Sequence, residues 1–119
     1  AIRDTLREAL EDEGYRVDEA ADGIAGLEIL RASGENMVVL LDQLMPKLDG
    51  VGVLRAVQSD PLLAHRHTYI LLTARSRMST PVTDLATELG VPIIRKPFDL
   101  DTLFQAIVEA IARLEGNHT

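Results

Sequence analysis

The stretch MVVLLDQLMPKLDG, residues 37–50, places five apolar residues directly before a carboxylate, Asp42. A continuous apolar run of this kind is typical of a parallel strand that is covered on both faces. An unpaired charge is costly to bury, so Asp42 either emerges at the end of that strand or meets a cation. Asp49-Gly50 forms a turn, and a helix follows it.

The rest of the chain alternates between helical and extended patterns. Buried strands that alternate with helices predict an α/β fold, a doubly wound open parallel sheet with helices on both faces. In such sheets, ligands bind at the carboxyl ends of the strands. The expected helices run over 2–13, from Asp22 to Ser33-Gly34, after Gly50, from Thr80 to Gly90 and from Leu100 to Leu114. The expected strands are 15–20, at an edge of the sheet, and 37–41, 69–73 and 91–94. Residues 59–67 are expected to form a connector.

Composition excludes several classes of function. The chain has 119 residues, which fits one domain over 1–119. Its net charge of −7 argues against direct nucleic-acid binding, which needs clustered Lys and Arg. It contains no cysteine, and no apolar stretch approaches the roughly 20 residues that cross a bilayer. We therefore expect no membrane association and a cytoplasmic location.

Three polar side chains follow three successive buried strands. Asp42 closes the first, Thr73 closes the second, and Lys96 follows the third. Together they suit an oxygen nucleophile that receives a tetrahedral oxyanion, with Lys96 neutralising its charge and Thr73 donating a hydrogen bond. Each residue alone has an ordinary structural interpretation, as a turn former, a strand residue or a solvated surface charge.

At these residues the sequence resembles the response-regulator receiver domains of bacterial two-component signalling, which are CheY-like. LLDQLMPKLDG resembles their phosphoacceptor loop, YILLTAR their fourth strand, and IIRKPFDLDTL their fifth strand with its Lys-Pro and final helix. EDEGYRVDEAADG is similar to the segment from their first helix to their second. The resemblance covers essentially the whole chain in order and spacing.

The resemblance implies a flavodoxin-like sheet with strand order 2-1-3-4-5. It implies that a sensor histidine kinase or a phosphotransfer protein donates a phosphoryl group to Asp42, with Lys96 and Thr73 contacting that group. It also implies a Mg²⁺ site that uses Asp42 and the backbone carbonyl of Leu44. Such a domain catalyses only its own phosphorylation and dephosphorylation, so it is not an enzyme in the usual sense.

The chain departs from the family at its beginning. Receiver domains start with a hydrophobic strand that ends in an acidic pair, and this sequence begins immediately after that position. Asp4 and the acidic cluster 11–13 lie in the expected first helix and do not replace the pair. We expect an N-terminally incomplete domain, with Mg²⁺ binding only where that pair is present. Without the strand, a neighbouring chain fills the gap or the flanking strands close together.

A second departure is Ile93. The family carries a Tyr or Phe three residues before the lysine, and its ring swings inward when the threonine moves toward the phosphoryl group. Isoleucine is shorter and β-branched, so it cannot provide an aromatic rotamer switch. The resemblance therefore assigns Thr73 and Ile93 to the switch, with a different mechanism of transmission.

The sequence leaves other functions open. A degenerate receiver that binds partners without phosphorylation is the main alternative. An aspartate-nucleophile phosphatase shares the Asp, Thr and Lys set, but it carries a second acid where this chain has Leu44. Flavin binding is disfavoured because the chain has two Tyr, two Phe and no Trp. The family's fourth helix, fifth strand and fifth helix form the expected face for an output domain or a homodimer.

Overall fold

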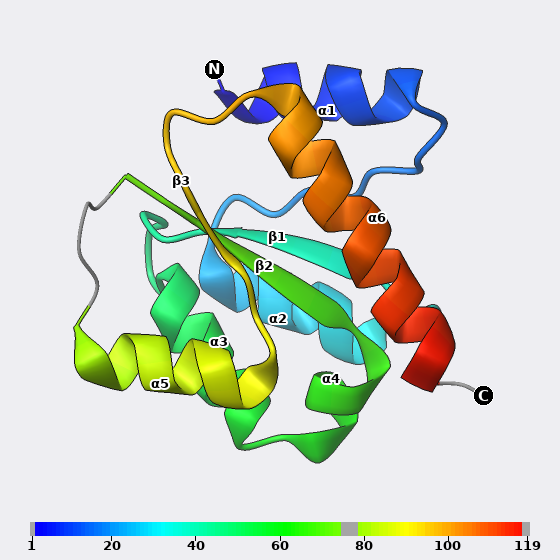
Figure 1. The fold of residues 1–119 in the computed structure, drawn as a ribbon. Helices are drawn as coiled ribbons and strands as arrows, with labels where there is room; N and C mark the ends of the chain where they lie inside the picture. The colour runs from blue at the N-terminus through cyan, green and yellow to red at the C-terminus, as the bar shows by residue number, and fades with distance from the viewer. Residues whose placement is uncertain (1, 75–78, 118–119) are drawn as a thin grey trace.

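A parallel sheet lies between two groups of helices in the computed structural model (Figure 1). The structure describes residues 2–74 and 79–117, and the side chains of 4–74 and 79–115. The elements are α1 (Ile2–Asp12), α2 (Gly23–Ala32), β1 (Val38–Asp42), α3 (Gly50–Gln58), α4 (Pro61–Arg66), β2 (Thr68–Thr73), α5 (Thr80–Leu89), β3 (Ile93–Arg95) and α6 (Leu100–Asn117). Within these residues, no helix is both long and apolar enough to span a lipid bilayer.

The described sheet has three parallel strands in the order β1-β2-β3. Val38 pairs with Thr68 at one end of the β1–β2 ladder, and Asp42 pairs with Leu72 at the other. This confirms the predicted parallel α/β class and the buried strands. β3 starts two residues later than the predicted 91–94 stretch. Pro92 explains the shift, because it has no N–H to donate and contributes only its carbonyl, which accepts from the N–H of Leu71.

Alternate residues of β2 face opposite layers of the molecule. Tyr69 and Leu71 pack in one core with α2, α3, α4 and α5, whereas Ile70 and Leu72 pack in a second core with α1 and α6. Both layers are apolar, which is why the strand reads as a continuous apolar run and not as an alternating one. α1 and α6 therefore cover one face of the sheet, and the other helices cover the opposite face (Figure 1).

The segment Tyr15 to Ala20, expected to be an edge strand, forms no strand in the structure. Its alternation of apolar and polar residues is strand-like, and Tyr15 and Val17 do pack against the α1–α6 core. A strand also needs a neighbour that accepts and donates backbone hydrogen bonds. Residues 15–20 belong to none of the ladders that the structure describes, so the strand prediction for this segment is wrong.

The expected connector 59–67 contains a helical turn, α4. Asp60 caps it by accepting hydrogen bonds from the N–H groups of Leu62 and Leu63, at 3.2 and 3.5 Å. Pro61 occupies the first turn, where its missing N–H costs nothing. The Asp-Pro signal was present in the sequence, but the helix is only six residues long.

His67 is a buried structural residue that joins three elements. Its side chain is 2% exposed. Its Nδ1 accepts from the N–H of Met37 at 3.0 Å, and its Nε2 lies 3.2 Å from the carbonyl oxygen of Leu30. These partners define a neutral ring with the proton on Nε2, which donates to Leu30. The ring thus ties the end of α2 to the starts of β1 and β2.

We predict that the fold loses stability as the pH falls through the titration range of this ring. Burial lowers the pKa of His67, and the charge of Arg66 acts in the same direction, against the hydrogen bond to Leu30. The unfolded chain therefore binds a proton more readily, so the free energy of unfolding declines as the pH falls below about 6.5.

Urea unfolding between about pH 7.5 and 5.5 checks this expectation, since that window contains the ordinary histidine pKa and lies above those of the carboxylates. His67→Gln should flatten the dependence. His65→Gln, at an exposed position on α4, is the matched control and should keep it. An unchanged slope in His67→Gln would contradict the assignment.

Candidate functional site

The carboxyl ends of the three described strands lie together at the same end of the sheet. Asp42 is the last residue of β1, and Thr73 is the last of β2. Lys96 follows β3, and its N–H donates to the carbonyl of Thr73 at 2.7 Å. The backbone ladders therefore continue to the strand ends, and this register holds the three predicted site residues on neighbouring strands.

The structure pairs two of these side chains directly. Nζ of Lys96 donates to Oδ2 of Asp42 at 2.8 Å, across 54 positions of sequence. Oδ1 of Asp42 accepts from the N–H of Leu44 at 3.1 Å. The side chains of Lys96 and Asp42 are 22% and 37% exposed, so water screens the pair and it adds at most about 1 kcal/mol to stability. Its main effect is to place a cation beside an accessible carboxylate.

Thr73, Leu44 and Ile93 lie in different environments around this pair. Thr73 is buried at 1% exposure, while the side chain of Leu44 points to solvent at 75%. Ile93 is half-buried, pairs with Leu71 across the sheet, and packs against the core beneath α3 and α5. The predicted switch residue therefore contacts the layer that contains α5, not the layer that contains α6.

Gln43 organises the loop after Asp42 and was missed by sequence reasoning. Its side chain is 7% exposed. Its Oε1 accepts from the N–H of Val51 at 3.0 Å, and its Nε2 lies 3.5 Å from Oδ2 of Asp49. Its carbonyl accepts from the N–H of Gly50 at 3.3 Å. A polar residue next to the apolar run was the available signal, since a buried amide must find partners.

The same loop also rests on the start of α2. Lys47 has a φ of 65°, and its Nζ lies 3.7 Å from Oδ2 of Asp22. The other carboxylate oxygen of Asp22, Oδ1, caps α2 by accepting from the N–H of Ala25 at 2.8 Å. Gly23 lies under Leu48, and a Cβ at Gly23 would stand 2.1 Å from the Leu48 carbonyl oxygen. The predicted start of this helix at Asp22 is confirmed, and Asp22 contacts the loop as well as capping the helix.

The described residues do not form a complete magnesium site. Mg²⁺ favours several oxygen ligands in octahedral geometry. Here Asp42 is the carboxylate at the strand ends, and it already pairs with Lys96. In the part of the chain that the structure covers, no three acidic or histidine side chains gather as ligands. This donor set does not suit Mg²⁺, so the function is derived below without the metal.

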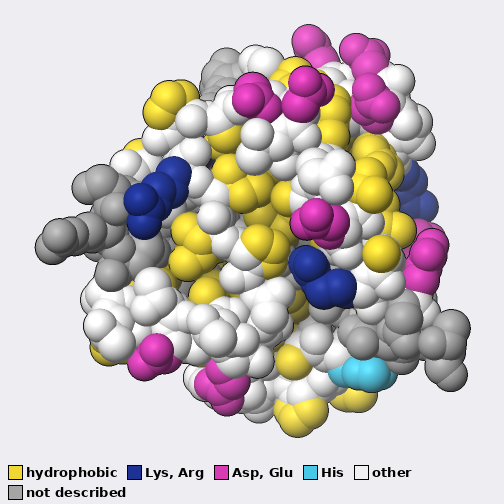
Figure 2. Space-filling view, in the orientation of Figure 1, with side chains coloured by type: hydrophobic (Ala, Val, Ile, Leu, Met, Phe, Trp, Pro, Cys, Tyr) yellow, Lys and Arg dark blue, Asp and Glu magenta, His cyan; other side chains and the backbone are white. Residues whose placement is uncertain are grey.

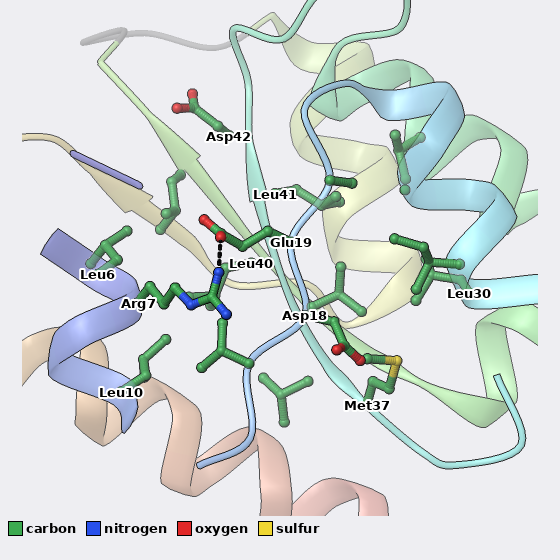
Figure 3. A pocket seen from close by; sticks show the side chains of 18 of the residues that line it. Leu6, Arg7, Leu10, Asp18, Glu19, Leu30, Met37, Leu40, Leu41 and Asp42 are labelled. Carbon is green, nitrogen blue, oxygen red and sulfur yellow. Dashed lines mark hydrogen bonds and ion pairs between the residues drawn. The ribbon is translucent and has the colours of Figure 1, made fainter. Parts of the chain in front are cut away.

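A cavity of about 1010 Å³ extends from this edge along β1. Asp42, Leu44 and Lys96 line one end, and Met37 lines it at the start of the strand. Figure 3 shows Asp42 at one end of the space and Met37 at the other, with Arg7 of α1 bonded to Glu19 between them. Residues of β1 therefore line this cavity along the whole length of the strand.

The chain as a whole is acidic, and its charges are unevenly spread over the surface. The chain has 19 Asp and Glu against 12 Lys and Arg. On the face in Figure 2, acidic side chains gather over α1, while basic side chains stand apart from one another. An apolar area lies at the centre of this face, over the region where β3 crosses the sheet in Figure 1.

Comparisons with known proteins agree with this architecture. The sequence profile of the response regulator receiver domain matches residues 1–108. The chain is 37% identical over 106 residues to response regulator MprA of Mycobacterium sp. (strain KMS), covering 87% of this chain and 43% of that protein. It is 38% identical over 108 residues to transcriptional regulatory protein DltR of Streptococcus agalactiae serotype III (strain NEM316), covering 90% and 46%. The chain thus spans less than half the length of these relatives.

A solved structure gives the same result. The CheY-like response regulator receiver domain protein of Methanospirillum hungatei JF-1 superposes with a TM-score of 0.76 at 26% identity, covering 98% of this chain and 87% of that one. This superposition agrees with an open parallel α/β fold of the CheY-like kind. The chain belongs to the response regulator receiver domain family of two-component signalling, so it is not a conventional enzyme.

The Gln43 contacts generate a stability prediction. Gln43→Leu leaves the buried N–H of Val51 without its acceptor, so we expect a loss of about 1–3 kcal/mol in the free energy of unfolding. Gln58→Leu removes an exposed hydrogen bond from Gln58 on α3 to Glu88 on α5, and it should change the free energy of unfolding by less than about 0.5 kcal/mol. Urea titration measures both, and equal effects would count against the role of Gln43.

Gly23 provides a second prediction about the loop. Gly23→Ala forces the Leu48 backbone away, and we expect it to cost about 1–3 kcal/mol and to shift the amide resonances of residues 44–48. Gly26→Ala is the control on the same helix, because its Cβ would meet only Ala20 at 3.8 Å. That control should gain up to about 1 kcal/mol from helix propensity. Similar behaviour of the two variants would refute the close approach.

Proposed function

We propose that Asp42 is the phosphoacceptor of this receiver domain. The observation that carries the proposal is the 2.8 Å contact between its carboxylate and Nζ of Lys96 at the accessible end of β1. A phosphohistidine on a sensor histidine kinase or a phosphotransfer protein is the proposed donor. The family implies a histidine kinase as partner.

The reaction is a transfer from nitrogen to oxygen. A carboxylate oxygen of Asp42 attacks phosphorus, a P–O bond forms as the P–N bond breaks, and the leaving imidazole keeps the electron pair and takes a proton. Lys96 offsets the charge that gathers on the phosphoryl oxygens. Thr73, buried at the neighbouring strand end, is proposed to donate a hydrogen bond to the same group. The product is an acyl phosphate on Asp42.

The added charge is proposed to shift the domain between two conformations. A new dianion at the sheet edge favours any state that brings Lys96 and Thr73 closer to it. Ile93 lies on β3, two strands from Asp42, and packs toward α5, so we propose that the change spreads through α5, β3 and α6. That face would then meet an output domain or a second copy. In the family's own numbering, the complete sheet would have the strand order 2-1-3-4-5. The strands β1, β2 and β3 of this structure would then be strands 3, 4 and 5 of that sheet.

A receiver that binds partners without phosphorylation is the second candidate. The observation that favours it is the small number of possible Mg²⁺ ligands. Among the described residues, Asp42 is the carboxylate at the strand ends, and it pairs with Lys96. In that case, the Asp42–Lys96 pair is a structural link between β1 and the end of β3.

Phosphoryl uptake distinguishes the two candidates. The domain, produced with the family's first strand and acidic pair ahead of residue 1, is incubated with acetyl phosphate over a series of Mg²⁺ concentrations, and its intact mass is measured. We expect a gain of one phosphoryl group that Asp42→Asn abolishes, because no attacking carboxylate remains. Lys96→Ala should slow uptake at least tenfold.

Asp101→Asn is the control, since Asp101 is an exposed carboxylate at the start of α6, and its uptake should be unchanged. Folding of each variant is checked by circular dichroism. A folded chain that gains no mass at any Mg²⁺ concentration would favour the interaction module and reject the phosphoacceptor.

A further inference from the structure

Gln43 is the first residue after β1 and directly follows Asp42. Its backbone N–H still donates to the carbonyl of Leu72 at 2.9 Å, so the chain leaves the sheet only after this residue. Its side chain is 7% exposed, although an amide is costly to bury without hydrogen-bond partners. The partners of this amide therefore show which part of the structure it holds in place.

The side chain of Gln43 holds the first turn of α3. The first N–H groups of a helix have no acceptor within the helix. Oε1 of Gln43 accepts from one of them, the N–H of Val51, at 3.0 Å. Asp49 accepts from the next, the N–H of Gly52, at 2.8 Å. Nε2 of Gln43 lies 3.5 Å from Oδ2 of Asp49, so the two groups that cap α3 also contact each other.

The peptide unit between Gln43 and Leu44 connects this helix start to the Asp42 carboxylate. A trans peptide unit is rigid and planar, and its C=O and N–H point in opposite directions. The carbonyl of Gln43 accepts from the N–H of Gly50, the first residue of α3, at 3.3 Å. On the other side of the unit, the N–H of Leu44 donates to Oδ1 of Asp42 at 3.1 Å. The position of α3 therefore sets the direction in which this N–H meets the carboxylate.

The start of α3 lies so close to Asp42 that residue 50 has no room for a side chain. A Cβ on Gly50 would stand 2.7 Å from Cδ1 of Leu71 and 3.0 Å from the carbonyl oxygen of Asp42. It would also stand 3.1 Å from Oε1 of Gln43. The helix start, Gln43 and Asp42 thus form one closely packed unit, and a displacement of one of them moves the others.

The two carboxylate oxygens of Asp42 have different partners. Oδ2 accepts from Nζ of Lys96 at 2.8 Å, while Oδ1 accepts from the N–H of Leu44. Contacts on both oxygens limit the rotation of the carboxylate. An attacking oxygen must approach phosphorus within a narrow range of directions, so a loss of orientation lowers the rate of the transfer more than it weakens binding of the donor.

We propose that Gln43 is a positioning residue for phosphoryl transfer to Asp42. Its buried amide holds the first turn of α3, and α3 holds the peptide unit that follows Gln43. That unit orients the carboxylate through the N–H of Leu44. Gln43 acts through these groups and not on phosphorus itself. The inference rests on the proposed function, since a reaction at Asp42 is what this orientation serves.

Gln43→Met tests the proposal, because methionine has a similar length and lacks the amide. The variant is made in the domain with the family's first strand and acidic pair ahead of residue 1, and the mass gain is followed over a series of acetyl phosphate concentrations. A carboxylate oxygen of Asp42 attacks phosphorus, the P–O bond to acetate breaks, and acetate leaves with the electron pair. We expect the maximal rate to fall about tenfold and the half-saturating concentration to change less than about twofold.

Three further variants separate positioning from a general loss of stability. Ile107→Val removes a buried methyl group from the core that contains α6, so it lowers stability without touching the loop, and the maximal rate should be unchanged. Gly50→Ala displaces the helix start by another route and should act like Gln43→Met. Gly26→Ala is its control, because a Cβ there would meet only Ala20 at 3.8 Å, and it should keep the wild-type rate. Circular dichroism shows whether each variant is folded.

The amide of Leu44 provides a readout that needs no phosphoryl group. In the chain of 119 residues, Gln43→Met should speed hydrogen exchange of this amide about tenfold, because its N–H loses the aligned carboxylate acceptor. The amide of Ala25 also donates to a carboxylate, Oδ1 of Asp22 at 2.8 Å, and it should keep its exchange rate. Faster exchange of both amides would indicate general loosening of the fold and would count against the proposal.

Two other results would overturn the proposal. One is a wild-type maximal rate in folded Gln43→Met or Gly50→Ala, and the other is unchanged exchange of the Leu44 amide. Either would leave Asp42 as the phosphoacceptor. A wild-type domain that gains no mass would reject the phosphoacceptor itself, and with it the role of Gln43 in the transfer.

Discussion

Register between parallel strands is the constraint on which the rest of this molecule depends. The ladders bring Asp42 opposite Leu72 and Thr73 opposite Arg95, so residues that are far apart in the sequence lie together at the carboxyl ends of the strands. Only then does Lys96 reach the carboxylate of Asp42. A shift by one residue would turn every side chain of β2 to the opposite layer and would exchange the two cores. The apolar packing on both faces therefore fixes the polar site.

The local patterns in the sequence predicted most of what positions this site. Continuous apolar runs identified β1 and β2 because both faces of the sheet are covered. The strand-end rule then put Asp42, Thr73 and Lys96 on one edge, and the structure pairs Asp42 with Lys96. The start of α2 at Asp22 was also predicted, and Asp22 accepts from a backbone N–H there. Asp49 was predicted only as part of a turn, and the structure shows that it also caps α3.

The features that the sequence did not reveal depend on partners far away in the chain. Residues 15–20 have a strand pattern, but a pattern cannot supply the neighbour that a ladder requires. Gln43 and His67 look like ordinary surface residues until the fold encloses them and provides Val51, Met37 and Leu30 as partners. Burial of a polar group is a property of the tertiary structure, so its role becomes visible only there.

Burial of β2 on both faces also limits which sequences this fold accepts. Tyr69 and Leu71 pack in one core, and Ile70 and Leu72 pack in the other. A charged side chain at any of these four positions would be buried, whichever layer it faced. Sequence change along this strand is therefore restricted to exchanges among largely apolar residues.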